Sequence, residues 1–225
     1  MIVSHKYKFI FWKPHKVAGT SILLALRDIC GDEDIVGGFE YGISEADGGS
    51  GVAIPPNNID QLELHKTGPG IGPINHIHPS HLRRALPSEV WDNYTKFTVV
   101  RNPWDRVVSQ FLYRATPQAK KIRPEVPLSK VISNSHEQNA YYFNYCNKTS
   151  NILGTFPDIT LRFENLESDF KELCTKLELP DISLPVTRKV EKKANFSYRD
   201  YYDSETRAAV AEQNSVIINE YGYSF

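Results

Sequence analysis

Short apolar runs alternate along the chain with segments whose apolar residues recur at helical spacing. Residues 7–12 are rich in aromatic and branched side chains and predict a strand, whereas residues 21–29 show the apolar spacing of a helix. A second unit begins with the apolar run 97–100, which predicts a buried strand. Asn102 and Pro103 then provide an N-cap and a proline at the first helical position. The pattern therefore predicts two successive strand–loop–helix units.

The remaining periodic segments continue this alternation. The helix that starts at Pro103 carries one apolar stripe, made by Trp104, Val107, Val108 and Phe111. Farther along, residues 159–163 predict a strand, residues 166–177 a helix and residues 204–220 a last helix. Alternating strands and helices are typical of a mostly parallel sheet that helices cover on both faces. We therefore predict an α/β fold in which residues 1–225 form a single domain.

A long segment between the first two units lacks this periodicity. Ten of the 13 glycines lie between Gly31 and Gly72, and Pro55 and Pro56 fall in the same stretch. A segment of this length without a pattern of its own, inside a compact domain, is either functional or disordered. We interpret residues 31–73 as an acceptor-facing insertion or a lid.

Composition excludes several classes of protein. The 225 residues are 40% hydrophobic and 24% charged, and 26 Lys and Arg residues nearly balance 27 Asp and Glu residues, which gives a net charge of −1. These values disfavour a disordered chain and a protein that coats a polyanion, and no nucleic-acid partner is expected. Any anion site must therefore be built from local basic side chains and backbone amides.

The cysteines and the N-terminal run bear on the compartment. Cys30, Cys146 and Cys174 are widely spaced and form no C-x-x-C pair, so neither a disulfide framework nor a zinc site is predicted. The apolar run near the N-terminus is too short for a signal-peptide core or a membrane span. We expect a soluble, cytoplasmic protein without a membrane partner, and no oligomeric state is predicted.

The segment from Lys13 to Ser21 joins the first predicted strand to the first predicted helix. Backbone N–H groups and the positive helix end favour an anion at such a junction, and Gly19 lets the anion approach closely. Lys16 adds a mobile positive charge, and Thr20 and Ser21 add hydroxyl donors. The Walker A pattern G-x-x-x-x-G-K-[ST] is absent because the lysine precedes the glycine, which disfavours a nucleoside-triphosphate enzyme.

A second candidate anion site follows the second predicted strand. Arg101 stands where that strand ends, and Ser109 lies two turns along the next helix, away from its apolar stripe. Arginine offers two parallel donors to a phosphate, and a serine hydroxyl adds another. Two anion sites on neighbouring strand–helix units suggest a ligand that carries two anionic groups.

Both motifs resemble those of one enzyme family. Residues 16–21 are similar to the 5′-phosphosulfate loop of sulfotransferases that use 3′-phosphoadenosine 5′-phosphosulfate (PAPS), and residues 101–109 resemble their 3′-phosphate motif, R-[DN]-P-x-x-R-x-x-S. The amino-acid sequences of these two motifs are most similar to those of the Golgi-type carbohydrate sulfotransferases and their soluble bacterial and viral relatives. The resemblance continues at residues 161–166 and 195–223. One departure is His15, which stands where these relatives usually have proline.

This resemblance implies a P-loop-like sulfotransferase fold and in-line transfer of a sulfuryl group from PAPS to an acceptor hydroxyl, expected on a glycan. It assigns Lys16 a catalytic role, the neutralisation of charge on the leaving phosphate oxygen. The residues that it implies for cofactor binding are Lys16, Val17, Ala18, Gly19, Thr20, Ser21, Arg101 and Ser109. No catalytic metal is implied, and no metal-ligand pattern is present in the sequence.

The acceptor hydroxyl requires a general base, and histidine is its usual provider. Three histidines lie close together, and if residues 75–78 are extended, two of them point the same way. Related sequences often carry a histidine six residues before a leucine here, which ranks His76 first, His78 second and His81 third. An alternative base is a glutamate in or beside the glycine-rich segment, namely Glu40, Glu45 or Glu63.

Two other function classes remain alternatives. One is a kinase-like transferase with a divergent phosphate loop, and the other is a non-catalytic module of the same fold that binds anions or glycans.

Two clusters of basic residues either bind an anionic ligand or are solvated surface charges without a binding role. The first lies within residues 114–123 and the second within residues 188–199.

Overall fold

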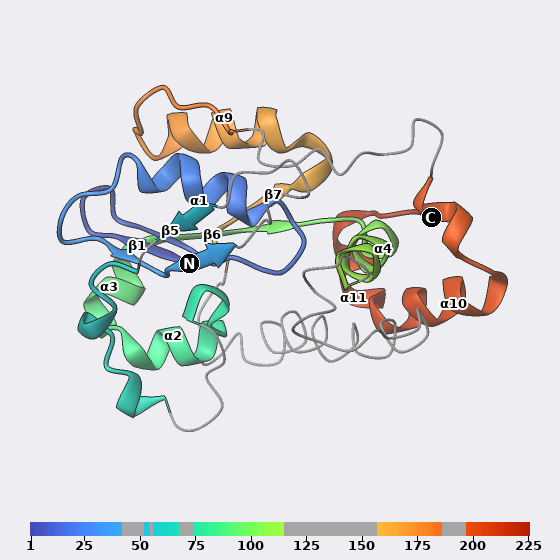
Figure 1. Cartoon of the computed structure of the whole chain (residues 1–225), viewed down its shortest axis with the longest axis horizontal. Coiled ribbons are helices and arrows are strands. Elements are labelled where there is room, and N and C mark those ends of the chain that lie inside the picture. Colours follow the sequence, from blue (N-terminus) through green and yellow to red (C-terminus); the bar gives the residue numbers. More distant parts are fainter. Residues whose placement is uncertain (42–51, 55, 68–73, 115–156, 186–196) are drawn as a thin grey trace. The chain divides into compact units, whose positions relative to one another are not determined.

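The computed structural model describes residues 1–41, 52–54, 56–67, 74–114, 157–185 and 197–225 (Figure 1). The chain divides into two compact units, each with its own hydrophobic core. The first unit comprises Met1–Val100 and Thr155–Thr187, and the second comprises Arg101–Gly154 and Arg188–Phe225. Within the described ranges, no helix combines the length and the apolar character needed to cross a membrane.

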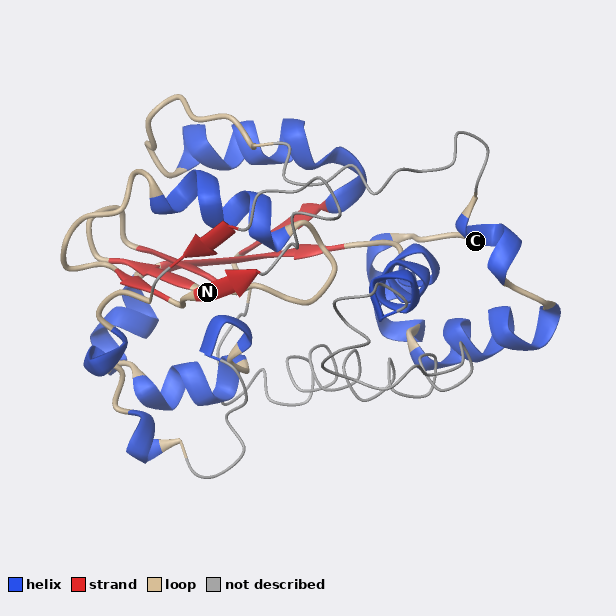
Figure 2. Ribbon diagram, in the orientation of Figure 1, coloured by secondary structure: helices blue, strands red, loops and turns tan. Residues whose placement is uncertain are grey.

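The first unit is built on a sheet, whose strands are red in Figure 2. The sheet has five strands in the order β3-β1-β2-β6-β7. Its strands are β1 (Ile2–Ser4), β2 (Phe9–Phe11), β3 (Ile35–Val36), β6 (Thr95–Val100) and β7 (Ile159–Arg162). The three strands expected from the sequence, β2, β6 and β7, run parallel, whereas β1 pairs antiparallel with both β2 and β3. The predicted α/β class is confirmed, and the sheet is mixed because two short strands add to its parallel part.

Helices cover both faces of this sheet (Figure 1). Helices α1 (Gly19–Arg27) and α9 (Leu166–Lys176) lie on one face, and α2 (Pro79–Ala85) and α3 (Ser88–Asn93) lie on the other. Apolar side chains of the central strands and of α1 and α9 form one buried cluster, which includes Phe11, Phe97, Val99, Leu161, Ile22, Leu26, Phe170 and Leu173. This core fixes the point at which each parallel strand ends.

The segment 31–73 contains regular structure where it is described. Strand β3 forms an edge of the main sheet, and β4 (Phe39–Tyr41) pairs antiparallel with β5 (Val52–Ile54) in a separate two-stranded sheet. Two short 3-10 helices follow, η2 (Ile59–Gln61) and η3 (Leu64–Lys66). The segment shows no period in the sequence although its described residues contain regular structure, because strands of two or three residues are too short to show a period. Its role as a lid stays a prediction.

Asp34 anchors the start of this segment to the turn between β1 and β2. Its fully buried carboxylate accepts hydrogen bonds from Ser4 Oγ at 2.7 Å and from the backbone N–H groups of His5 at 2.6 Å, Lys6 at 3.1 Å and Gly31 at 3.0 Å. Burial alone would raise the pKa of Asp34, but these hydrogen bonds outweigh it and hold the pKa below its usual range. The carboxylate is therefore charged in the folded state.

The second unit is helical in its described residues and begins with α4 (Pro103–Arg114). The predicted N-cap is present, since Asn102 Oδ1 accepts hydrogen bonds from the N–H groups of Trp104 at 3.1 Å and Asp105 at 3.4 Å. The predicted stripe is also present. Trp104, Val107 and Val108 are buried, and Phe111 is half-buried.

The last predicted helix is two helices. Helix α10 (Ser204–Gln213) ends at Asn214, and α11 (Ser215–Tyr221) begins directly after it. The side-chain amide of Asn214 donates to the carbonyl of Val210 at 2.8 Å, and its backbone N–H donates to the same oxygen at 3.1 Å. The prediction of one continuous helix over residues 204–220 is wrong at Asn214, where φ and ψ of −118° and 18° leave the helical region and the buried side chain competes with the backbone N–H for the Val210 carbonyl.

Asp34→Asn is predicted to lower the free energy of unfolding by about 1–3 kcal/mol at pH 7, because three backbone donors and a hydroxyl lose a charged acceptor. A carboxyl whose pKa is lower in the folded state stabilises the fold above its unfolded pKa, near 4, and this contribution is lost as the pH falls through the folded pKa. Urea unfolding from pH 7 to pH 3 should therefore show the difference from wild type shrinking with acid.

The control for this change is Asp28→Asn, which alters an exposed carboxylate that pairs with Arg27 at 3.6 Å. Equal stability of the two variants at pH 7 would contradict the anchoring role of Asp34.

Candidate functional site

Trp12 fixes the point at which the chain leaves β2. Its backbone N–H donates to the carbonyl of Phe97, and its backbone carbonyl accepts from Thr98 Oγ, each at 3.0 Å. The backbone of Trp12 is therefore held against β6. Its indole N–H donates to the carbonyl of Ile77 at 3.0 Å. Ligands of open α/β sheets bind at the carboxyl ends of parallel strands, and the loop after Trp12 stands at such an end.

The loop that follows adopts a backbone conformation that its residue types disfavour. Lys16 and Ala18 have φ angles of 64° and 59°, a left-handed region that costs a non-glycine residue about 1–2 kcal/mol. Val17, between them, is 1% exposed and packs in the main core. Backbone strain of this kind concentrates at functional sites.

The start of α1 has no side-chain cap. Ala18 is its N-cap and offers no acceptor to the first turn, and the first backbone bonds run from the N–H groups of Ser21 and Ile22 to the carbonyl of Ala18. Helix geometry thus leaves the N–H groups of Gly19 and Thr20 without an acceptor inside the helix. Outward N–H groups at the positive end of a helix suit an anion.

Lys13 lies directly against Gly19. A Cβ atom at position 19 would stand 2.5 Å from Cγ and 3.2 Å from Cε of Lys13, so only glycine fits there. Lys13 is 3% exposed, and burial lowers its pKa to about 8. The sequence motif does not single out Lys13 as a site residue. Its position directly after the predicted strand, three residues before Lys16, is the feature of the sequence that could have indicated such a role.

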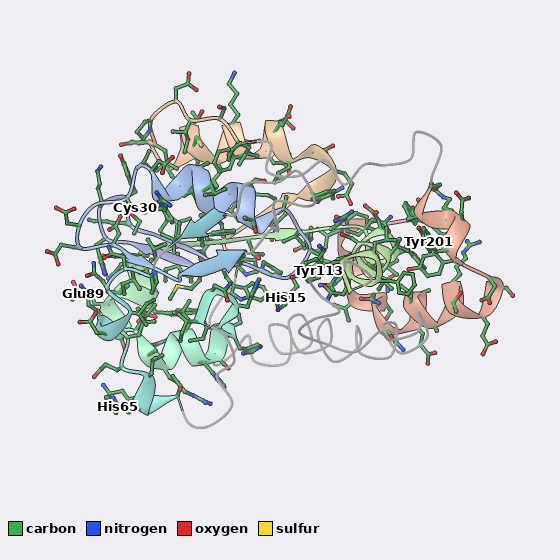
Figure 3. The ribbon with its side chains drawn as sticks, viewed as in Figure 1. His15, Cys30, His65, Glu89, Tyr113 and Tyr201 are labelled. Atoms are coloured by element: carbon green, nitrogen blue, oxygen red, sulfur yellow. The ribbon has the colours of Figure 1, made fainter. Side chains whose placement is uncertain are left out.

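His76 joins this loop from a distant part of the sequence. Its Nδ1 lies 2.9 Å from the carbonyl oxygen of Lys13, so Nδ1–H donates and Nε2 carries the lone pair. Its ring stacks on His15, with centroids 3.7 Å apart (His15 is labelled in Figure 3). Burial, followed by the charges of His15 and Lys13, lowers the pKa of His76 to about 2, so the ring is neutral.

The chain around His76 is not extended. Residues Ile74–His76 form the 3-10 helix η4, and Pro79 starts α2. The condition under which His76 and His78 would point the same way, an extended segment over residues 75–78, is therefore not met. His78 is buried, and as the N-cap of α2 its Nδ1 accepts a hydrogen bond from the N–H of Ser80 at 3.2 Å.

The other candidate bases lie in different surroundings. His81, on α2, is half-buried, and burial followed by the charge of Arg84 lowers its pKa. Glu63 pairs with Lys66 one turn away. Glu45 and the side chain of Glu40 lie outside the described residues.

Arg101 and Ser109 belong to the second unit. Arg101 is the residue directly after β6, and its Nε and Nη2 lie 2.9 Å and 2.7 Å from Asp105 Oδ2. Asp105 and Ser109 are four residues apart on α4 and share one helix face. Arg106, in the same motif, is buried. The motif thus presents a guanidinium held by a carboxylate at the start of a helix, with a hydroxyl on the same face.

The basic clusters are only partly described. Arg199 lies in η7 (Tyr198–Tyr201), where its guanidinium is 4.8 Å from the ring centroid of Tyr198. The cluster within 114–123 lies outside the described residues except for Arg114, as does the rest of the cluster within 188–199. In the part of the chain that is described, no three His, Cys, Asp or Glu side chains gather into a group able to hold a metal ion.

Comparison with known proteins identifies the family. A family model described as the sulfotransferase family matches residues 1–220, a range that includes both motifs. The chain therefore belongs to the sulfotransferase family, as the sequence predicts. No curated protein matches the chain, and neither does any solved structure.

Gly19→Ala is predicted to lower the free energy of unfolding by about 1–3 kcal/mol, because the new methyl group overlaps the stem of Lys13. Denaturant unfolding measures this change. Gly31→Ala is the matched control, since a Cβ there meets Lys6 at an ordinary contact distance of 3.5 Å. If the two variants lost equal stability, the close approach of Lys13 to Gly19 would be disproved.

Proposed function

We propose that this protein transfers a sulfuryl group from PAPS to an acceptor hydroxyl on a glycan. Membership of the sulfotransferase family supports sulfuryl transfer in general. The observation that carries the choice of donor is the start of α1, an uncapped helix end that follows a parallel strand through a left-handed loop. Such an end offers several donors and positive charge to a doubly anionic phosphosulfate group.

The residues of the first loop fit this group. The N–H groups of Gly19 and Thr20 and the hydroxyls of Thr20 and Ser21 would hold the 5′-phosphosulfate, with Val17 and Ala18 setting the backbone turn. Strand β2 is followed after a short loop by the first motif, and its parallel neighbour β6 is followed directly by the second. Arg101 and Ser109, after β6, would hold the 3′-phosphate, in keeping with the preference of arginine for phosphate oxygens.

Bound PAPS supplies a sulfuryl group already activated by a phosphate leaving group. Because little covalent chemistry is then left to the protein, positioning and charge stabilisation dominate, as in phosphoryl transfer. Lys16 would neutralise the negative charge that develops on the leaving phosphate oxygen. No metal is required for this role.

His76 is the base favoured by the geometry. Its Nδ1–H is held by the carbonyl of Lys13, which fixes the ring and leaves the Nε2 lone pair to accept the proton of the acceptor hydroxyl. An anion at the loop would offset the positive charges of His15 and Lys13, which contribute to the low pKa of His76, and would raise its basicity. His78 ranks second because its Nδ1 caps α2.

Lys16→Ala and Arg101→Ala are predicted to affect different quantities. Loss of Lys16 should reduce turnover by about 100-fold or more while leaving affinity for adenosine 3′,5′-bisphosphate (PAP), the product nucleotide, within a few-fold of wild type. Loss of Arg101 should weaken PAP binding by about 10- to 100-fold. Calorimetry measures the affinity, and transfer from labelled PAPS to a panel of glycans, lipids and small alcohols measures turnover and identifies the acceptor.

Lys66→Ala is the control for these two changes, since its side chain is half-exposed and pairs with Glu63. Negligible effects of both Lys16→Ala and Arg101→Ala on both quantities would refute the assignment of the two motifs.

His76→Ala is predicted to lower the rate of transfer by about 10²- to 10⁴-fold, the usual contribution of a general base, without weakening PAP binding. The same substitution at His81, on the next helix, should leave the rate close to wild type. Full turnover by the His76 variant with normal PAP affinity would show that another group is the base.

A further inference from the structure

The buried side chain of Lys13 has no role in the motifs described above. Its stem runs along the start of α1, since Cγ, Cδ and Cε all lie within 3.3 Å of the Cβ position of Gly19. The ammonium is one bond beyond Cε and therefore lies at the same helix end. This places a lysine head group on the interior side of the loop, whereas Lys16, on the loop itself, is only half-buried.

The surroundings of this ammonium carry positive charge. The helix end contributes about half a positive charge, which opposes a cation placed there. His76 lies near Lys13 on the facing turn with His15 stacked on its ring, Lys16 follows in the loop, and the amino group of Met1 lies near it from β1. Each of these named groups is neutral or positive, so an anion that enters among them is attracted by their charges.

We infer that Lys13 is a second anion-binding lysine of the loop, which contacts the 5′ anionic group of the bound nucleotide from the interior of the unit. Lys16 contacts the same group from the half-exposed side. The inference rests on the proposed function, because it assumes that a nucleotide with a 5′ anion binds at the start of α1. It also explains why Gly19 must lack a side chain, since the stem of Lys13 passes there.

A dependence of binding on pH follows from the burial of Lys13. With a pKa of about 8, Lys13 is charged below pH 8 and loses its proton above it, and a bound anion favours the charged form. Affinity for PAP should therefore be full below pH 8 and fall as the pH rises above it. The phosphate groups do not titrate in this range, because their second pKa is about 6.

The experiment is calorimetric titration of wild type, Lys13→Met and Lys96→Met with PAP at pH 7.5, 8.5 and 9.5. At pH 8.5 each titration is run in two buffers of different ionisation enthalpy, which gives the number of protons taken up on binding. Wild type should take up about one half to three quarters of a proton per PAP at pH 8.5, since a lysine with a pKa of about 8 is partly protonated at that pH before PAP binds. Lys13→Met, which keeps most of the side-chain stem, should bind PAP about 10- to 100-fold more weakly at pH 7.5. It should also take up fewer protons on binding than wild type does. Lys96→Met removes another buried lysine, one that pairs with Asp158, and should keep the wild-type affinity and proton uptake.

Three outcomes separate this inference from the proposed function. Binding of PAP by wild type without proton uptake, or an unchanged affinity and pH profile in Lys13→Met, would overturn the role of Lys13 and leave the proposed function in place. Failure of wild type to bind PAP at any pH would overturn both. Absence of proton uptake in wild type would overturn the role of Lys13 even if Lys13→Met does not fold.

Discussion

The site depends on how the chain leaves β2. The Trp12 N–H donates to the carbonyl of Phe97, and the Trp12 carbonyl accepts from the side-chain hydroxyl of Thr98, so Trp12 is held against β6. Its indole N–H donates to the carbonyl of Ile77, and the next carbonyl, that of Lys13, accepts from His76. These bonds hold the loop between the parallel part of the sheet and the η4 turn. Val17 is anchored in the core between Lys16 and Ala18, whose left-handed backbone leads into the uncapped start of α1. Core packing and the candidate anion site therefore meet in the same short loop.

Several positively charged groups gather at this loop in the described part of the chain. An uncapped helix end, a half-buried Lys16 and a buried Lys13 lie together, and His76 is kept neutral by burial and by its cationic neighbours. Such an arrangement has an unfavourable self-energy without a ligand and is relieved by an anion. A histidine that acts as a general base must be neutral before it accepts a proton, and His76 is in that state. In the proposed function, one cluster of charges would serve both donor binding and acceptor activation, in a chain whose net charge of −1 gives no sign of it.

Local signals in the sequence predicted most of the fold. The parallel strands, the Asn102 cap and the stripe that begins at Trp104 follow from short-range periodicity and capping, and the structure contains all three. Strands β1 and β3 are too short to show a period, and the break at Asn214 depends on a side-chain hydrogen bond that helical spacing does not reveal. The contact of Lys13 with His76 joins residues 63 positions apart, so only the folded chain shows it. The roles of Lys16, His76, Arg101 and Ser109 stay predictions.

The most direct measurement is a comparison of nucleotide affinities by calorimetry at neutral pH. If PAPS is the donor, PAP should bind with high affinity, and adenosine 5′-monophosphate should bind about 10- to 100-fold more weakly because it lacks the 3′-phosphate. ATP with magnesium should bind no more tightly than adenosine 5′-monophosphate. Tighter binding of ATP with magnesium than of PAP would contradict sulfuryl transfer from PAPS and would favour a kinase-like enzyme.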